Sequence, residues 1–568
     1  MSIAHLPRLH HQSAIMHILD LPPELVLNIA AHLTQADLLN ISLTNRRLRD
    51  VTEPELFREY SNASTERSFK PFLWRLIDRP ELAKYVRRVD LRTYYDLSTL
   101  SATYAIECTT VEYKVFTDAA VTAGVITTIL PFELNSSVLE RIDDQDEWYD
   151  YVYDDKVRIT DVPYDTKFCK LLRAGTEEPL VILLLSLLPN LRCIDIRGTQ
   201  FFSQSLEWRN THSFRALTHF TVHRPEGTEA DNLGWSLGYL NRLLCGANMT
   251  HFNVLFACGT WLFKPQAPLS LAPRSTKITH LTLSQCSLTK TYMEILLQAC
   301  APLEKLHYSA GGGGMGSGNF NASELMVLLE PHKHTLRELY LNLAEDWDFF
   351  ESPGILPTLR DYTQLKHIDT NMESWSDILL EPDNDEDDVW AEQLDDQDPL
   401  DNTVQRLCDR LPPSLECLTL HELDDLTWDY RQLVHLVLEG SKLLPSLKLV
   451  ELVESRGSWL RERYSQLTQL LDLRPSDSSD GECVFEILSA KEYRARADFL
   501  AAGGLQRSHM SQLVWDGYKY WIRDDETAEE EESDIEYVYD LDLVRHVLPS
   551  EDHDSSGSSD GSDGSGED

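Results

Sequence analysis

The sequence predicts an α/β protein in which a small N-terminal helical bundle precedes a long array of parallel strands. Three observations predict this fold class. Apolar residues recur at helical spacing between residues 20 and 57, and an apolar pattern then repeats along most of the chain. Acidic segments without apolar periodicity interrupt and end this array, so we expect disordered insertions and a disordered tail.

The repeated unit is apolar-x-x-apolar-x-apolar, as in Ile278, Leu281 and Leu283. Successive units start 25 to 33 residues apart, with one spacing of 50 residues. This range is typical of leucine-rich repeats, in which each unit adds one short parallel strand and a helical or irregular return. An earlier unit, Val86/Val89/Leu91, is expected to open or cap the array. The nine later units start at Leu191, Leu217, Met249, Ile278, Leu303, Leu336, Leu365, Leu415 and Leu447.

The acidic composition limits the kinds of partner. Lys plus Arg total 51 against 93 for Asp plus Glu, so the formal net charge is −42. Such a charge repels phosphate backbones and anionic bilayers, and we expect neither nucleic acid nor membrane as a partner. The ten Cys form no CxxC pair, which favours a reducing location, cytoplasmic or nuclear. No apolar run is long enough to span a membrane.

Residues 373–401 carry thirteen carboxylates and no Lys or Arg, which explains the one spacing of 50 residues as an insertion at about 376–404. The acidic tail contains Ser555, Ser559 and Ser562, which are candidate sites for an acid-directed kinase. A literal GxGxxG pattern at 311–316 lies in a glycine cluster and predicts a flexible loop rather than a dinucleotide site. Without a catalytic motif, we expect no enzyme, no cofactor and no metal.

The N-terminal pattern describes short amphipathic helices that are apolar on too many sides to be stable alone. Pro22 and Pro23 can open a helix, and Thr34 with Asp37 predicts the cap of a second one. This stretch of about 40 residues resembles the F-box. The resemblance is carried by Leu21-Pro22-x-Glu24-Leu25, Ile29, Leu33, Asp37-Leu38 and Arg46-Arg47-Leu48.

Together with the repeats, this resemblance identifies the chain as similar to F-box and leucine-rich-repeat proteins of the fungal type. It implies that the F-box docks on the Skp-family adaptor of a cullin-based ubiquitin ligase, while the repeats hold a protein substrate and the chain performs no bond chemistry. A non-degradative interaction scaffold is the alternative. The adaptor contacts that the resemblance implies are Leu21, Pro22, Leu25, Ile29, Leu33, Leu38 and Leu43.

These assignments divide the chain into five predicted parts. They are a flexible tail (1–13), the F-box (14–62), the leucine-rich-repeat solenoid (63–455), a C-terminal capping region (456–545) and a disordered acidic tail (546–568).

In each repeat strand, residues that alternate with the apolar pair should point away from the core, onto a concave face. Seven of the nineteen His fall on such positions. The face is therefore a candidate substrate-binding surface; polar residues tolerated at half-exposed positions are the alternative, and a metal site lacks support. The candidate residues are Asp195, His219, Thr221, His223, His251, Asn253, His280, Thr282, His307, Tyr340, His367, Asp369 and His421.

His219, His251 and His280 occupy the same position on three successive units, so they should stack roughly 5 Å apart. Stacking disfavours simultaneous protonation, and some of their pKa values should fall below roughly 6.5. Substrate capture should then depend on pH. Acidification would weaken capture through neutral imidazoles, and it would strengthen capture of an acidic or phosphorylated segment, which is the version we favour.

Overall fold

The computed structural model describes part of the chain, and every described residue belongs to the first of two compact units, Met1–Val514 and Trp515–Asp568. The acidic insertion, the 311–316 loop and the tail serines lie outside the described residues, as does most of the predicted capping region. The described residues are 18–62, 68–92, 108–126, 167–173, 175, 177–197, 214–223, 235–246, 248–255, 257–258, 268–310, 321–343, 355–371, 375, 407–421, 436, 440, 442–454 and 484–489.

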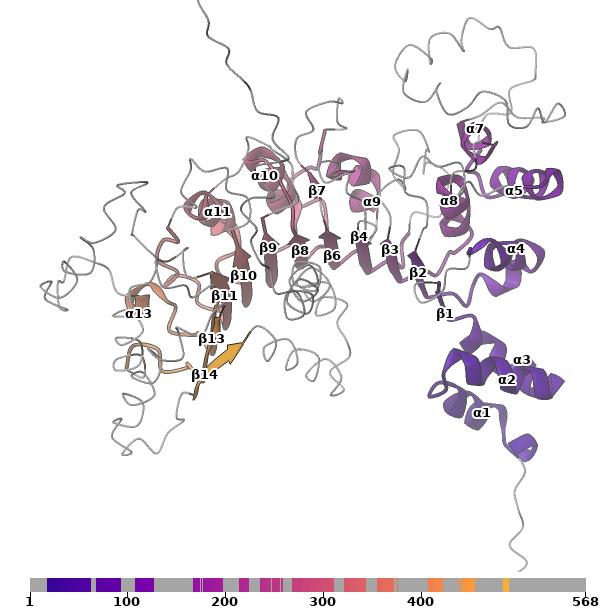
Figure 1. Cartoon of the computed structure of the whole chain (residues 1–568), viewed down its shortest axis with the longest axis horizontal. Helices are drawn as coiled ribbons and strands as arrows, with labels where there is room; N and C mark the ends of the chain where they lie inside the picture. The colour runs from indigo at the N-terminus through magenta and orange to yellow at the C-terminus, as the bar shows by residue number, and fades with distance from the viewer. Residues whose placement is uncertain are drawn as a thin grey trace, which may run out of the picture. The chain divides into compact units, whose positions relative to one another are not determined.

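A bundle of three short helices opens the described chain (Figure 1). Pro23 stands in the first turn of α1, where its missing N–H costs nothing. The Thr34 side chain accepts a hydrogen bond from the Asp37 amide, so the predicted cap is confirmed. The bundle has a small core of Val26, Ala30, Leu38 and Leu48. Its elements are η1 (Ile18–Asp20), α1 (Pro23–Ala30), α2 (Gln35–Thr44) and α3 (Arg46–Leu56).

A parallel twelve-stranded sheet follows, in which each strand pairs with the next along the chain apart from β5 (Trp235–Ser236) and β7 (Ala257–Cys258), which pair with each other. Every predicted unit from Val86 to Leu447 supplies one of these strands. The strands are β1 (Glu59–Ser61), β2 (Arg88–Arg92), β3 (Cys193–Arg197), β4 (His219–His223), β6 (His251–Leu255), β8 (His280–Ser284), β9 (Lys305–Ser309), β10 (Glu338–Asn342), β11 (His367–Asn371), β12 (Cys417–His421), β13 (Leu449–Glu454) and β14 (Val484–Ser489).

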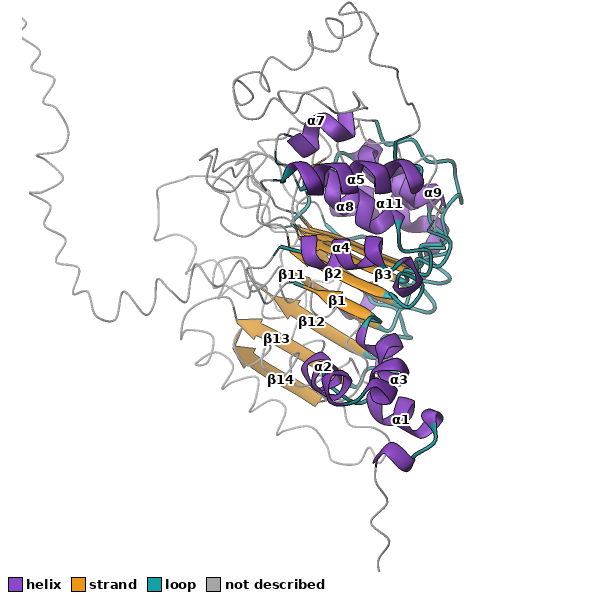
Figure 2. Ribbon diagram, turned by 90° about the vertical axis from the view of Figure 1, so that its right-hand side faces the viewer, coloured by secondary structure: helices purple, strands orange, loops and turns teal. Residues whose placement is uncertain are grey.

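The returning segments place helices on one side of the sheet (Figure 2). Parallel strands need such crossovers, and the helices bury one face of the sheet. The nine residues of α8 are all buried. The helices and short 3-10 turns are α4 (Lys70–Asp78), η2 (Pro80–Leu82), α5 (Thr110–Thr122), α7 (Lys167–Arg173), α8 (Glu178–Ser186), η5 (Leu237–Leu240), α9 (Asn241–Gly246), α10 (Lys290–Ala299), α11 (Ala322–Leu329), η6 (Glu330–His332) and α13 (Leu407–Arg410).

The register aligns the apolar pair of each strand with that of its neighbours. Phe220 pairs with Phe252, which pairs with Leu281, and Leu281 pairs with Leu306. These side chains belong to one continuous apolar core that also contains the inner faces of the helices. The first, third and fifth residues of each strand consequently lie on the opposite face of the sheet, which we call the polar face.

The sheet extends beyond the predicted array at both ends. β1 lies before the first predicted unit and pairs with β2, while β14 continues past residue 455, where the repeats were expected to end. Between β2 and β3, α5, α7 and α8 intervene, and the two strands still pair directly.

Phe57 and Tyr60 connect the bundle to the main core. The Tyr60 ring stacks on Phe72 of α4 at 3.9 Å between centroids, and Phe57 lies 6.3 Å from the same ring. No helix within the described ranges is long and apolar enough to cross a membrane.

Candidate functional site

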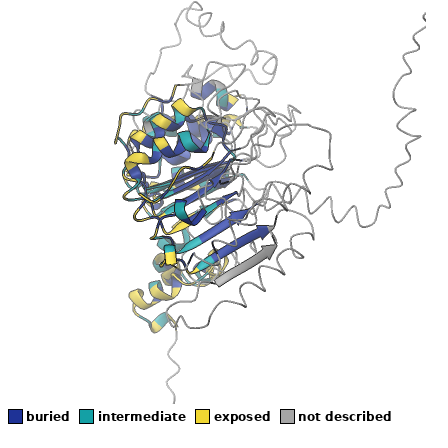
Figure 3. Ribbon diagram, turned by 90° about the vertical axis from the view of Figure 1, so that its left-hand side faces the viewer, coloured by how far each residue is buried: buried dark blue, intermediate teal, exposed yellow. Residues whose placement is uncertain are grey.

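Four apolar side chains on α1 and α2 are exposed, and we call them the apolar surface of the bundle: Leu25, Ile29, Leu39 and Leu43. Leu25 and Ile29 lie four residues apart on α1, as do Leu39 and Leu43 on α2, so each helix presents one exposed stripe. Leu43 is 67% exposed. The bundle is largely exposed, in contrast to the buried sheet (Figure 3). Both helices pack on α3, which leaves their other sides to solvent.

The predicted adaptor-contact residues divide into those that are at least partly exposed and one, Leu38, that is buried. Pro22 is exposed and Leu21 and Leu33 are half-buried. Leu38 is only 4% exposed, so it packs inside the bundle and is not available to a partner. Leu39, which the sequence analysis did not select, is exposed in its place. The helical phase of α2 explains the exchange, because Leu38 lies on the side that packs against α3 and Leu39 is rotated by about 100°.

Arg47 holds the segment that enters α1. Its guanidinium donates a 3.1 Å hydrogen bond to the Leu21 carbonyl and a second one to the Leu19 carbonyl. Five donors in a rigid planar group make arginine suited to joining two carbonyls. The positions of Leu21 and Pro22 therefore depend on α3.

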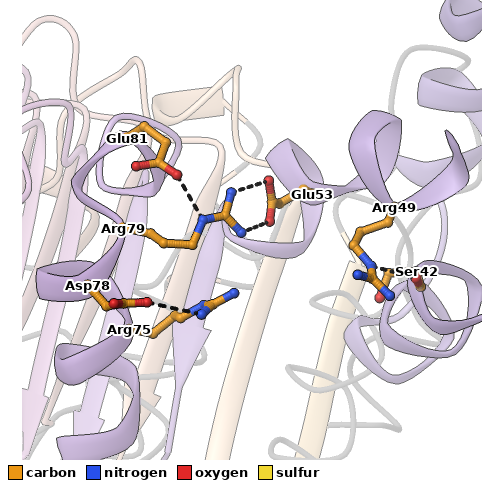
Figure 4. A network of polar contacts seen from close by, with 7 residues as sticks. All are labelled: Ser42, Arg49, Glu53, Arg75, Asp78, Arg79 and Glu81. Atoms are coloured by element: carbon orange, nitrogen blue, oxygen red, sulfur yellow. Dashed lines mark hydrogen bonds and ion pairs between the residues drawn. The ribbon is translucent and has the colours of Figure 1, made fainter. Parts of the chain in front are cut away.

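A polar network joins α3 to the start of the sheet (Figure 4). Arg79 donates to both carboxylate oxygens of Glu53, at 2.6 and 3.0 Å, and its Nε donates to Glu81 at 2.8 Å. The two carboxylates, Glu53 foremost, raise the pKa of Arg79. Arg49 donates to the Ser42 carbonyl and thereby ties α2 to α3.

The third residues of the strands form a row across the polar face, which we call the central row. The sequence analysis gave half-exposed polar positions as the alternative to a binding surface. Most of the row is instead buried; Asp90 and Asp369 are half-buried, and Ser61 is exposed. Strands about 4.8 Å apart place a neighbour on both sides of each side chain, which removes much of its contact with water. The buried members are Asp195, Thr221, Asn253, Thr282, His307, Tyr340, Thr419 and Glu451.

Hydrogen bonds and ring contacts link the central row. Asn253 Nδ2 donates to Thr221 Oγ1 at 3.2 Å. The His307 and Tyr340 rings are stacked at 3.7 Å. Asp369 lies next to the fifth residue of β12, because His421 Nε2 is 2.7 Å from Asp369 Oδ1.

His219, His251 and His280 are the first residues of β4, β6 and β8, and we call them the imidazole column. The register pairs them directly, and their rings stack at 4.1 and 4.2 Å with interplanar angles of 16° and 20°. The predicted stacking is confirmed, and all three rings are half-buried. Binding of a substrate by these rings stays a prediction. His367 is exposed on β11, and the side chain of His223 lies outside the described part of the structure.

A threonine precedes each ring of the column. Its hydroxyl lies 2.9 Å from the ring Nδ1 in all three cases, from Thr218, Thr250 and Thr279. The sequence analysis missed this feature, although the Thr-His dipeptide recurs at the same place in three successive units and could have revealed it.

Burial is the main cause of the low pKa values on the polar face. It lowers the pKa of His219 and His280 below 6.5, and for His219 the neighbouring imidazole of His280 adds to the effect. Burial lowers the pKa of His307 much further. His219, His280 and His307 are therefore neutral near pH 7.

The imidazole column is a poor metal ligand. Parallel rings more than 4 Å apart direct their nitrogen lone pairs side by side, whereas a zinc ion needs them to converge at about 2.0–2.1 Å. Across the described residues, no group of three or more His, Cys, Asp or Glu is arranged to hold a metal ion.

Comparison with known families assigns the N-terminal bundle. Residues 18–63 match the model of the F-box-like family, which covers α1, α2, α3 and β1. An F-box-like domain indicates, in general terms, a protein partner and a role in substrate recognition by ubiquitin ligases. No curated protein matches the chain.

Proposed function

We propose that the chain is the substrate-recognition subunit of a Skp/cullin/F-box ubiquitin ligase. In this proposal the apolar surface of the bundle binds the Skp-family adaptor, and the sheet is a leucine-rich-repeat solenoid whose polar face binds a protein substrate. The chain itself catalyses no bond chemistry and acts in the cytoplasm or nucleus. It would supply proximity, which raises the effective concentration of a substrate lysine near the ubiquitin-conjugating enzyme.

The observation that carries the proposal is the exposure of four large apolar side chains on α1 and α2, within the F-box-like match. Burying such side chains against a partner contributes roughly 1.5–3 kcal/mol each, which is typical of the central residues of an interface. The strand spacing of 25 to 33 residues from β3 to β11, and the sheet order, support the solenoid assignment.

Copurification of the full chain with the Skp-family adaptor and cullin tests the docking step. We expect Ile29→Asp to abolish adaptor binding, because a carboxylate would be buried unpaired at an apolar interface. Leu21→Asp together with Pro22→Asp should act likewise. Val327→Asp is the matched control, since Val327 is 73% exposed on α11, outside the F-box-like match. Adaptor binding that survives Ile29→Asp in a folded protein would overturn the docking assignment.

Copurification of the adaptor without cullin would instead support the non-degradative scaffold. A turnover assay on captured partners, with and without proteasome inhibition, separates the two functions. Partners whose abundance depends on both the chain and the proteasome are substrates, whereas partners with unchanged turnover indicate a scaffold.

A further inference from the structure

The imidazole column lies between two basic side chains on an otherwise acidic chain. The first-residue row runs from Arg88 on β2 through Cys193 to the column, and then to Lys305 on β9 and Glu338 on β10. Lys305 Nζ and the Glu338 carboxylate form an ion pair. The column therefore has one basic side chain at each end, each with a carboxylate on the next strand outward: Glu59 beside Arg88 and Glu338 beside Lys305.

Each threonine hydroxyl can keep its hydrogen bond to ring Nδ1 whether the ring is neutral or protonated. Thr218 Oγ1 donates to the Arg192 carbonyl at 3.2 Å, and Thr250 Oγ1 donates to the Thr218 carbonyl at 3.3 Å. A hydroxyl that donates its single hydrogen to a carbonyl can still accept from Nδ1–H. Protonation of a ring therefore leaves the Nδ1 contact intact, and the added charge appears at the Nε2 edge, away from the threonine.

From this arrangement, and resting on the proposed function of the polar face, we propose that the imidazole column binds carboxylate side chains of the protein substrate and binds them more tightly when it is protonated. Because Nδ1–H of each ring points at its threonine, only a protonated ring carries a hydrogen on Nε2, and the carboxylate accepts from that ring. Stacking disfavours two adjacent charged rings, so a single proton in the column is matched by the single charge of a carboxylate.

The charged groups around the column make its attraction for a carboxylate depend on protonation of the rings. Arg88 and Lys305 favour an anion, whereas several carboxylates on the same sheet oppose it. The carboxylates outnumber the cations among these groups, so the surroundings do not attract an anion while the column is neutral, and one added proton supplies positive charge in the column itself. The charged and titratable groups on the described neighbouring strands, or directly before them, include Glu59, Arg88, Asp90, Arg192, Cys193, Asp195, Glu304, Lys305, His307 and Glu338.

A phosphorylated ligand should respond differently to pH. A phosphate monoester takes up a proton near pH 6, so it loses charge in the range where the column gains it. A carboxylate keeps its charge throughout that range. The sign and the steepness of the pH dependence therefore distinguish the two ligands.

The test uses the full chain bound to its adaptor and three fluorescent decapeptides, one of alternating Gly and Glu, one with Gln for Glu and one with phosphoserine for Glu. Fluorescence polarisation would measure binding at about pH 6 and about pH 7.5. Uptake of up to one proton predicts that the Glu peptide binds about tenfold more tightly at the lower pH. The Gln peptide should show no such change.

His219, His251 and His280 all replaced by Gln should remove the pH dependence, and His251→Gln alone should reduce it if the triple variant fails to fold. The control replaces the exposed His32 and His334 with Gln, and it should bind like the wild type. Equal binding of the Glu peptide at both pH values, or binding of the phosphoserine peptide alone, would overturn the inference while adaptor binding in the same sample leaves the proposed function standing. Loss of adaptor binding in the wild type would instead overturn the proposed function.

Discussion

Adjacent residues in one helix can have opposite roles, as Leu38 and Leu39 show. Both belong to the apolar pattern of α2, yet one side chain is 4% exposed and the other 49%. A sequence pattern identifies the apolar stripe of a helix but does not determine which edge of the stripe meets the core. That choice depends on how α2 packs against α3, which is a tertiary property.

Leu38→Ala and Leu39→Ala should therefore affect different measurements. The first creates a cavity in a small core and should cost about 2–5 kcal/mol of stability in urea unfolding. The second should leave stability within about 0.5 kcal/mol and weaken adaptor binding. The assignment of the two side chains would be reversed if Leu38→Ala lost affinity with unchanged stability.

Arg47→Ala should weaken adaptor binding by releasing the segment before α1. Removing the guanidinium frees the Leu19 and Leu21 carbonyls, so the segment before α1 loses its fixed position. Binding should fall by about tenfold, corresponding to one or two lost hydrogen bonds to a charged group. Arg46→Ala on the same helix is the control, and an equal loss in both variants would argue against a positioning role of Arg47. Isothermal titration of adaptor into the full chain measures both.

At the scale of elements, the repeated strands could be predicted because each carries an apolar pair with fixed spacing. The two outermost strands break the template. In β1 the frame is Phe57, Tyr60 and Asn62, with a buried polar residue at the third apolar position. In β14 the corresponding frame begins at Glu482. A strand at the edge of a sheet packs against one neighbouring strand instead of two, so its sequence follows the apolar pattern less closely.

The capping box of α5 is another feature defined at this scale. Thr109 and Glu112 exchange hydrogen bonds between their side chains and backbone amides, and Lys70 pairs with Glu112 at 3.3 Å. Thr109→Ala should cost about 1 kcal/mol and raise hydrogen exchange in the first turn of α5. Thr122→Ala, at the other end of the same helix, should change neither quantity appreciably. Equal effects of the two variants would show that the cap contributes nothing specific.

At the scale of the whole molecule, buried and half-buried histidines link stability to pH. The pKa values of His219, His280, His307 and His332 are all lowered from 6.5, with burial as the main cause. Because the unfolded chain binds protons more readily, this contribution to stability is complete above about pH 6.5 and is lost as pH falls through the lower folded values. As pH falls, the carboxylates also take up protons and repel one another less, so the dependence of stability on pH combines this effect with that of the histidines.

His307→Gln should isolate the histidine contribution. The variant loses the stack with Tyr340 and should be less stable at pH 7.5, yet the fall in its urea midpoint between about pH 6.5 and pH 5 should be smaller than in the wild type. His334→Gln, at an exposed position, is the control and should follow the wild-type curve. A parallel pair of curves for wild type and His307→Gln would exclude His307 as a source of the acid sensitivity.

The sheet order also has a consequence for how the chain folds. From β8 to β13, each strand pairs with the strand formed one repeat earlier in the sequence, so every pairing closes a loop of modest length at a small entropic cost. Pairing can therefore spread from any neighbouring pair without waiting for a distant segment. On the ribosome, the N-terminal bundle and the first strands can reach their final contacts while the later strands are still being synthesised.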